Sequence, residues 1–342
     1  MKKIRFPEDE LAHDSIIEWW YFNGHLADNK NNKYAFMSCL FKVKTKEVKI
    51  PFISNIPKKT IYFSHSIVSD IKNQKYYPVI NYFSIISRDS WKRPLLFVNY
   101  TNPITVKGYL NSVIEQIEAN KYRVKEEIFD LNLISTKKPL LEGGEGFLKV
   151  GETKSTYYYS LTNLKTQGMI KIDNEWIRVT GKSWMDHQWA DVKYTKDEWT
   201  WFSIQLDNNT EIMCFEYREN KTKTYLASIL YPDNTQKHLT KMQVTPLGDS
   251  WKSSKTKNNY QISWQIKIPE EKINLKVKPL IRGQEMIFGV INYWEGPISV
   301  AGICNNKRVE GQGFLELIGR PTQYPNIKLI KKEILDKIKN VR

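Results

Sequence analysis

Short stretches of alternating apolar and polar residues, separated by turn residues, run along almost the whole chain. Successive side chains of a strand point to opposite faces, so this period of two marks strands with one buried face. The separators are rich in Asn and Asp, which tolerate the positive φ of tight hairpins. Such stretches are residues 19–26, 33–43, 61–69, 157–161, 169–172, 199–206, 211–218 and 225–231, with 207–209 among the turns. The pattern predicts an all-β chain of antiparallel meanders.

The length of 342 residues exceeds that of an ordinary domain of roughly 100–200 residues, so we expect two β-barrel or sandwich domains packed together. Segment 181–198 mixes aromatic and acidic residues without a strand period, and the strand pattern resumes at Trp199. The domain boundary is therefore placed near residue 192, which gives units 1–192 and 193–325. A single wide barrel, or a continuous two-sheet sandwich, is the competing architecture.

Two segments predict helices. The apolar residues of segment 326–342 fall on one face of a helix whose other face is rich in Lys. We expect this C-terminal amphipathic helix to pack on a barrel, and peripheral contact with a membrane surface is the alternative. Segment 111–119, rich in Ile and Glu, is a weaker helix prediction.

Composition excludes several classes of protein. An aromatic content of 13% supplies enough bulky apolar surface for a large core, so the chain is not disordered. No apolar run is long enough for a transmembrane helix, and no apolar stretch follows the N-terminal lysines as in a signal peptide, so a cytoplasmic location is expected. The net charge of +15 comes from scattered lysines without an Arg-rich arm, so no nucleic-acid partner is expected.

Cofactor and metal motifs are also absent from the sequence. Cys39, Cys214 and Cys304 are widely spaced and form no CxxC pair, and there is no HxH, HExxH or Gly-rich phosphate loop. We therefore expect buried free thiols, no metal and no cofactor.

The densest group of chemically capable residues lies in segment 181–191, with Trp184, Asp186, His187 and Trp189. Asp beside His is an acid/base pair only if both side chains converge, which a loop allows and a strand forbids. The alternative is structural: Asp186 caps a turn, His187 is a hydrogen-bonded core histidine, and the two Trp fill the end of a barrel.

Further candidates lie within predicted strands. In segment 18–25, Glu18 and Trp20 share one face, while Trp19 and Tyr21 share the other. Glu216 sits in an apolar strand, where the structural alternative is an ion pair with Arg218 of the same face. The candidate binding residues for a hydrophobic ligand are Trp20, Tyr21, His65, Trp184, Trp189, Trp201 and Trp294.

Six motifs along nearly the whole chain resemble the lipocalin-like family of carotenoid 1,2-hydratase (hydroxyneurosporene synthase) and AttH-like proteins. They are Glu18-Trp-Trp-Tyr-Phe, Ser64-His65, Thr156-Tyr-Tyr-Tyr-Ser160, residues 179–189, Tyr293-Trp-Glu-Gly-Pro297 and Gly311-Gln-Gly-Phe-Leu-Glu-Leu317. The resemblance implies two lipocalin-like β-domains around an apolar pocket. It implies that His187 and Trp189 matter for activity and that Glu216 stands where the hydratase has Asp. Two positions before Glu216, this chain has Cys214 where the hydratase has a tyrosine.

The expected activity is addition of water to an alkene of an isoprenoid or polyene-like substrate, or its cyclisation. Asp186 or Glu216, held protonated by burial, would donate the proton. Aromatic faces would stabilise the cation, and His187 would take a proton from water. A non-catalytic carrier of a lipophilic ligand is one alternative, and its cavity would be lined only by apolar and aromatic side chains. A hydrolase is the other, and it would need Ser64 or another hydroxyl beside a histidine.

Overall fold

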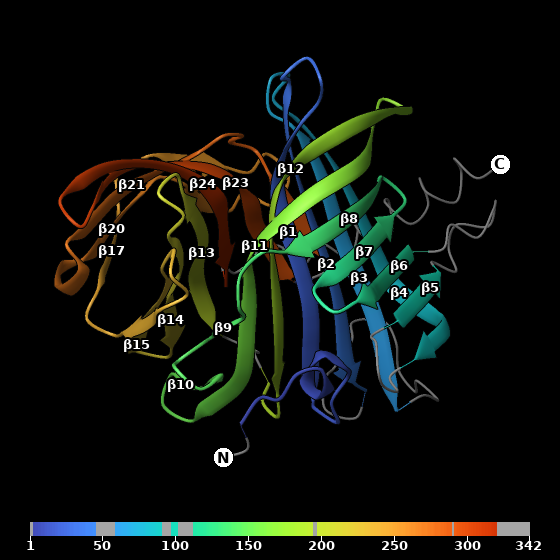
Figure 1. Ribbon diagram of the computed structural model, residues 1–342, viewed down its shortest axis with the longest axis horizontal. Coiled ribbons are helices and arrows are strands. Elements are labelled where there is room, and N and C mark those ends of the chain that lie inside the picture. The colour runs from blue at the N-terminus through green and yellow to red at the C-terminus, as the bar shows by residue number, and fades with distance from the viewer. Residues whose placement is uncertain are drawn as a thin grey trace.

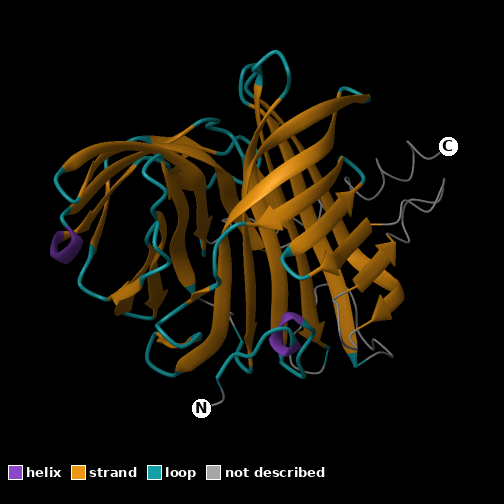
Figure 2. Cartoon of the chain, in the orientation of Figure 1, coloured by secondary structure: helices purple, strands orange, loops and turns teal. Residues whose placement is uncertain are grey.

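The computed structural model describes residues 3–45, 59–90, 97–101, 112–193, 197–288 and 291–319, and these residues form an all-β structure, as predicted (Figure 1, Figure 2). The strands belong to two large antiparallel sheets and one small two-stranded sheet. Within the described residues the helical elements are two single 3-10 turns, η1 (Glu8–Glu10) and η2 (Pro269–Glu271).

The first sheet closes into a barrel. Its strands are β1 (Ile17–Ala27), β2 (Lys33–Lys44), β3 (Thr60–Asp70), β4 (Lys75–Ser90), β5 (Phe97–Thr101), β6 (Ser112–Glu118), β7 (Lys121–Glu126), β8 (Phe129–Ser135), β9 (Leu140–Leu141), β10 (Phe147–Val150), β11 (Lys154–Ile172) and β12 (Glu175–Ala190). Strands β12, β1 and β2 to β8 follow one another, and β8 pairs with β11 to complete the ring. Closure satisfies the backbone hydrogen bonds that an edge strand would leave open.

The second sheet is open and curved (Figure 1). Its strands are β13 (Glu198–Leu206), β14 (Glu211–Glu219), β15 (Thr222–Leu230), β16 (Gln236–Leu239), β17 (Gln243–Pro246), β20 (Trp264–Ile268), β21 (Ile273–Pro279), β22 (Glu285–Phe288), β23 (Ile291–Cys304) and β24 (Lys307–Ile318). Strands β18 (Ser250–Lys252) and β19 (Asn259–Gln261) form the small sheet. The chain passes from the first sheet to the second after Ala190. The division into domains at residue 192 stays a prediction.

Among the residues that the structure describes, the buried apolar side chains form three cores. One fills the barrel, one lies in the concave face of the second sheet, and the third lies between the two sheets. Strand alternation sends neighbours to different cores: Trp20 and Phe22 of β1 enter the barrel, whereas Tyr21 faces the second sheet. The sheets are joined by polar contacts as well, because His25 Nε2 lies 2.8 Å from the Gly313 carbonyl oxygen.

Two local predictions are wrong and one is confirmed. Residues 181–190, for which no strand period was recognised, form the end of β12, and residues 112–118 are strand β6 rather than a helix. Strand β6 pairs with the strands that flank it in sequence, β5 and β7, and this pairing overrides the helix-like composition of β6. The hairpin over residues 207–209 joins β13 to β14 as predicted. The predicted helix 326–342 lies outside the described residues.

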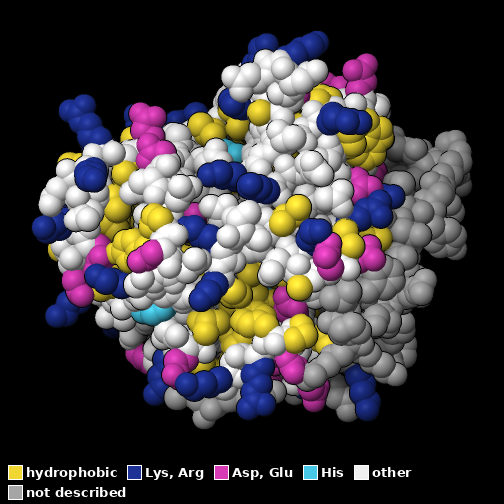
Figure 3. Space-filling view, viewed as in Figure 1, with side chains coloured by type: hydrophobic (Ala, Val, Ile, Leu, Met, Phe, Trp, Pro, Cys, Tyr) yellow, Lys and Arg dark blue, Asp and Glu magenta, His cyan; other side chains and the backbone are white. Residues whose placement is uncertain are grey.

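In the described part of the chain, none of the helical turns has the length and apolar character required to cross a bilayer. On the face seen in Figure 3, Lys and Arg side chains are dispersed among acidic and neutral groups and form no single basic field. The absence of a nucleic-acid partner stays a prediction, and so does peripheral contact with a membrane.

Candidate active site

A cavity of about 520 Å³ lies between the two sheets and is lined mainly by aromatic and aliphatic side chains. Its walls come from β1, β2, β3, β10, β11 and β12 on one side and from β13, β14, β23 and β24 on the other. Titratable groups enter the same cavity: His65, Asp186, Glu295 and Glu316 line it. An aromatic pocket with a few convergent polar groups is the usual form of a small-molecule site.

Strand register arranges the barrel wall as a row of directly opposed residues. Asp186 of β12 lies opposite Ser160 of β11 and opposite Tyr21 of β1. Tyr21 lies opposite Cys39 of β2, which lies opposite His65 of β3. Directly opposed residues of antiparallel strands share a face, so the row crosses five strands on the side that meets the second sheet.

The second sheet carries a matching row. Phe215 of β14 lies opposite Trp201 of β13, Trp201 opposite Glu316 of β24, and Glu316 opposite Glu295 of β23. The two rows meet where the Tyr21 hydroxyl donates a short hydrogen bond to Glu295. The ring of Tyr21 also meets Trp201 edge to face, with centroids 5.4 Å apart.

Asp186 is a fully enclosed carboxyl with three donors. Its Oδ1 accepts hydrogen bonds from Ser160 Oγ and Trp184 Nε1, both at 2.6 Å, and its Oδ2 accepts one from the Tyr158 hydroxyl at 2.7 Å. Trp201 Nε1 in turn donates to the Tyr158 hydroxyl at 3.1 Å. Burial raises the pKa of Asp186 to about 7, although the three donors oppose the shift. Asp186 is therefore both acid and base near neutral pH.

Glu295 and Glu316 form a second acidic site. Burial, together with the charge of Glu316, holds the pKa of Glu295 well above its ordinary value. Burial also raises the pKa of Glu316 to about 7, against a 2.6 Å hydrogen bond that Trp199 Nε1 donates to it. Two opposed carboxylates in an apolar cavity repel each other, so this pair holds at least one proton at neutral pH.

His65 closes one end of the barrel row. Its Nδ1 lies 2.6 Å from the Tyr293 hydroxyl, and the two rings stack with centroids 5.7 Å apart. Ser64 is in the same strand and its side chain therefore points to the opposite face, where it accepts a hydrogen bond from Asn81 Nδ2 at 3.0 Å. Ser64 and His65 do not form the pair that a serine hydrolase requires.

The structure brings only part of the predicted site together. Asp186, Tyr21, His65 and Trp201 line the cavity, and Trp184 supports Asp186 from the same face of β12. Five predicted residues lie elsewhere: His187, Trp20 and Trp189 on the barrel side, and Glu216 and Trp294 on the far side of the second sheet. Asp186 and His187 point to opposite faces because β12 is a regular strand, so they do not form one acid/base pair.

His187 belongs to a polar network inside the barrel. Its Nε2 lies 2.9 Å from Glu18 Oε1, and the same oxygen lies 2.8 Å from His13 Nδ1. Lys42 Nζ donates to Glu18 Oε2 at 2.8 Å. Burial lowers the pKa of His187 to about 4 despite the opposing effect of Glu18, so its imidazole is neutral at pH 7. Burial would raise the pKa of Glu18, but the hydrogen bonds from His13 and His187 and the charge of Lys42 lower it to about 2.

His13, Glu18 and His187 are also the described residues whose ligand atoms approach closely enough for a metal, within 4.8 Å of one another. The distances between them are those of hydrogen bonds, and the ammonium of Lys42 already neutralises the carboxylate. A cation beside Lys42 would be repelled. The arrangement fits a buried hydrogen-bond network better than a metal site.

Glu216 and Trp294 have structural partners. Glu216 Oε1 lies 3.0 Å from Arg218 Nε and 3.4 Å from Lys223 Nζ, which is the ion pair offered as the structural alternative. Trp294 Nε1 donates to the Arg282 carbonyl at 2.7 Å and its ring is fully buried in the core of the second sheet. The catalytic and binding roles of both residues stay predictions, and the geometry gives neither of them access to the cavity.

A family model described as AttH-like matches residues 1–320. The chain belongs to the AttH-like family. It is 23% identical over 200 residues to kievitone hydratase of Fusarium solani subsp. phaseoli, and 24% identical over 203 residues to dehydratase asqC of Emericella nidulans (strain FGSC A4). The matched parts cover 56% of this chain in both cases, and 56% and 58% of the two relatives, so this chain spans little more than half the length of each.

Two crystal structures share the fold of this AttH-like chain. An AttH protein of Nitrosomonas europaea superposes with a TM-score of 0.73 at 21% identity, covering 93% of this chain and 98% of that one. Kievitone hydratase of Nectria haematococca superposes with a TM-score of 0.75 at 17% identity, covering 94% of each chain. The lipocalin-like expectation for the fold is thus confirmed.

Sequence reasoning missed Glu295, Glu316, Tyr158 and Tyr293 as cavity residues. Each lies inside a motif that carried the family resemblance, but none was assigned a role. The sequence did carry a signal for two of them. Glu295 and Glu316 are single acids flanked by apolar residues within strands, where a solvated carboxylate is not expected.

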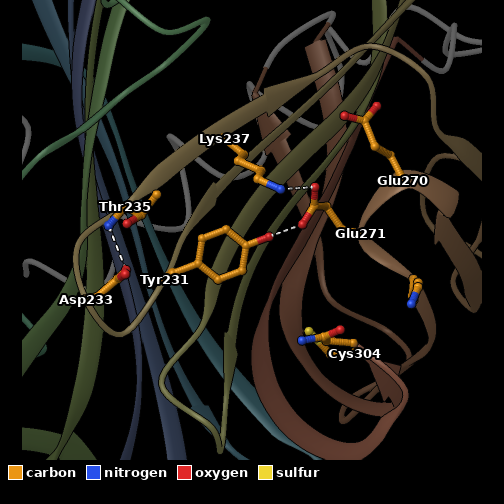
Figure 4. A pocket seen from close by; sticks show the side chains of 9 residues that line it. Tyr231, Asp233, Thr235, Lys237, Glu270, Glu271 and Cys304 are labelled. Atoms are coloured by element: carbon orange, nitrogen blue, oxygen red, sulfur yellow. Dashed lines mark hydrogen bonds and ion pairs between the residues drawn. The ribbon is translucent and has the colours of Figure 1, made fainter.

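A second hollow of about 360 Å³ lies on the second sheet, around Tyr231, Lys237, Glu271 and Cys304 (Figure 4). Glu271 accepts a short hydrogen bond from the Tyr231 hydroxyl and pairs with Lys237 Nζ at 2.6 Å. None of the residues that line this hollow also lines the cavity between the sheets.

Proposed function

We propose that this AttH-like protein is a hydro-lyase that adds water to, or removes water from, a hydrophobic substrate held between the two sheets. The observation that carries the proposal is the convergence of Asp186, Glu295 and Glu316 on one aromatic cavity. A carrier has no need for buried acids, which cost free energy to desolvate. The names of the two curated relatives, a hydratase and a dehydratase, point in the same direction.

The two acidic sites suit the two proton transfers of such a reaction. For hydration, protonated Asp186 donates its proton to an alkene carbon, and the Glu295–Glu316 pair takes a proton from the water that attacks the adjacent carbon. Dehydration runs the same steps in reverse. The faces of Trp199 and Trp201, which line the cavity, would stabilise positive charge on the substrate by about 0.5–2 kcal/mol each.

The cavity volume and its aromatic lining favour an isoprenoid or polyene-like chain as the hydrophobic part of the substrate. If the substrate excludes water, an internal hydroxyl or alkene would capture the same cation and cyclisation would result. Hydration and cyclisation therefore differ in what occupies the space beside the cation, not in the acid that starts the reaction.

The test is turnover of prenylated phenols and polyenes in water enriched in heavy oxygen, followed by mass spectrometry. The parent protein should incorporate label into a product, or lose water from one, and Asp186→Asn should lose this activity. Asp249→Asn changes an exposed aspartate that pairs with Arg282 and is the matched control. Substrate that binds but is never converted, by the parent as by Asp186→Asn, would refute the hydro-lyase proposal in favour of a carrier.

Two further variants separate the cavity acids from the residues that the sequence resemblance implied. His187→Gln and Glu216→Gln keep the size of each side chain and lie outside the cavity. If either variant loses turnover while its melting temperature is unchanged, the chemistry does not reside where the cavity acids lie.

A further inference from the structure

The walls of the cavity are arranged in layers. Residues two apart in a strand point to the same side and lie about 7 Å from each other. Tyr21, Asp186, Glu295 and Glu316 lie at one level of the strands, as their register and the hydrogen bond between Tyr21 and Glu295 show. We call this level the acid layer, and all four of its side chains are buried.

The neighbouring level is lined by aromatic rings, and we call it the aromatic layer. It lies two residues along the strands, in the direction in which β1 and β13 begin, and its rings are those of Trp19, Phe41, Phe63, Trp199 and Tyr217. The rings other than that of Tyr217 are partly exposed. The aromatic layer therefore lies between the acid layer and solvent, and a substrate that reaches the acids occupies both.

Gln188 places an amide in the aromatic layer. It follows Asp186 by two residues in β12, so it points to the same side and lies about 7 Å from it. Gln188 lies directly opposite Trp19 of β1 and Tyr158 of β11, and all three line the cavity. Within the described residues the Gln188 side chain makes no hydrogen bond, so its N–H and C=O groups are both available to a ligand.

Hydroxyl groups that line the cavity already have partners in the protein. Tyr21 and Tyr158 donate to carboxyls of the acid layer. The Tyr293 hydroxyl lies 2.6 Å from a histidine ring nitrogen, and the Tyr217 hydroxyl accepts from a lysine at 3.5 Å. Thr156 Oγ1 lies 3.1 Å from two backbone carbonyl oxygens. These groups hold the walls together and leave the Gln188 amide as the polar group for a ligand.

Asn292 is a second amide beside the cavity. Its nitrogen and oxygen have no hydrogen-bond partner in the part of the chain that the structure describes. Strand alternation places its side chain on the face of Trp294, which enters the core of the second sheet and not the cavity. Gln188 is therefore the amide that meets a ligand in the aromatic layer.

The charged groups at the outer end of the cavity are paired with each other. Asp197 Oδ1 lies 2.6 Å from Lys154 Nζ, and Glu198 Oε2 lies 2.9 Å from Arg218 Nη1. The carboxyls of the acid layer would repel an anionic group of a ligand. A polar group beside Gln188 is therefore neutral.

Filling the cavity changes the hydration of Gln188. A substrate in the aromatic layer strips water from the amide, and a polar group that loses its water without gaining a partner costs free energy. A ligand with an oxygen at this point avoids that cost. Sites that hydrogen-bond a polar group of the substrate reject analogues that lack it, so this layer disfavours a pure hydrocarbon.

We propose that Gln188 is a specificity-determining residue that hydrogen-bonds a neutral hydroxyl or carbonyl oxygen of the substrate, about 7 Å from the group that Asp186 protonates. The inference rests on the proposed function, because it takes Asp186 as the acid of the reaction. It narrows the substrate to an alkene that carries an oxygen at this spacing, within an otherwise hydrophobic molecule.

The test compares three saturated probes of similar shape: para-butylphenol, para-butylacetophenone and butylbenzene. Their affinities are measured by isothermal titration calorimetry for the parent, Gln188→Met and Gln167→Met. Methionine has nearly the length of glutamine but no amide, and Gln167 is exposed on β11, so Gln167→Met is the matched control. None of the probes contains an alkene, so failure of this test is distinguishable from failure of the hydro-lyase proposal.

The parent and Gln167→Met should bind both oxygenated probes about 3- to 10-fold more tightly than butylbenzene, the gain of one net hydrogen bond. Gln188→Met should bind all three with similar affinity. Equal affinities in the parent, no binding of the oxygenated probes, or a preference that survives in Gln188→Met would overturn the proposal. Gln188→Leu should behave as Gln188→Met does and keeps the test decisive if the methionine variant does not fold.

A second measurement separates Gln188 from the acids. The preference for the phenol should be the same at about pH 6 and about pH 8, because an amide does not ionise and a phenol with a pKa of about 10 stays neutral. Burial raises the pKa values of Asp186 and Glu316 to about 7, so their charge changes over this range. A preference that changes between the two pH values would assign the oxygen to an acid and overturn the role of Gln188.

Discussion

The raised pKa of Asp186 makes a quantitative prediction about folding stability. Its carboxyl titrates at about 7 in the folded chain, against an ordinary value of 3.8. An acid whose pKa is raised binds its proton more tightly in the folded state than in the unfolded state. Its contribution to folding stability is therefore fully present below pH 3.8 and is lost as the pH rises to about 7. The difference corresponds to about 4 kcal/mol over the whole interval, or about 1.4 kcal/mol for each pH unit.

Asp186→Asn removes this titration because an amide does not ionise. Between pH 5 and 7, the free energy of unfolding of the parent should therefore fall more steeply with pH than that of the variant, by about 1.4 kcal/mol per pH unit. Glu316 and Glu142 shift the pH dependence in the same direction as Asp186, and Glu18 and His187 in the opposite one. The difference between parent and variant isolates Asp186.

The assay is urea unfolding at several pH values between 5 and 8, with the slope of free energy against urea concentration checked for constancy. Asp249→Asn is the control, since hydrogen bonding to Arg282 lowers the pKa of Asp249 and keeps it ionised throughout this range. Parallel pH profiles for the parent and Asp186→Asn would refute the claim that Asp186 is protonated by burial.

Three further variants test the packing around the site. Glu18→Ala leaves Lys42 and two imidazoles without their buried partner and should destabilise the fold by about 3–5 kcal/mol in urea unfolding at pH 7. A loss below about 1 kcal/mol, the usual range of a surface ion pair, would contradict a buried polar network around Glu18. Trp20→Ala empties a fully buried site in the barrel and should cost about 3–5 kcal/mol; an unchanged midpoint would place that ring outside the core. Gly24→Ala would bring a Cβ within 2.3 Å of Ser183 Oγ and 2.7 Å of the Lys182 carbonyl oxygen, and should lower the melting temperature; equal temperatures would mean that β1 and β12 can separate there.

Local features were predictable because they depend on neighbouring residues. The period of two identified the strands, and it separated Trp20 from Tyr21 correctly. The hairpin at residues 207–209 followed from its turn residues. Composition misled at β6, where pairing with the flanking strands β5 and β7, and not the local composition, decides the structure.

The site was only half predictable for the same physical reason. Sequence proximity joined Asp186 to His187, but a strand sends them to different sides of the barrel wall. Glu295 and Glu316 reach Asp186 only through the packing of two sheets, and no local pattern specifies which faces pack together. The resemblance supplied the right motifs without the pairing between them.

The placement of the cavity has a consequence for how this protein can be divided. One wall belongs to residues before Ala190 and the other to residues from Asp197 onward, so neither half has a complete binding surface. Cutting the chain there would leave each fragment with a bare aromatic face, prone to stick to other molecules. Small slides of one sheet over the other would reshape the hollow without any substitution in its lining.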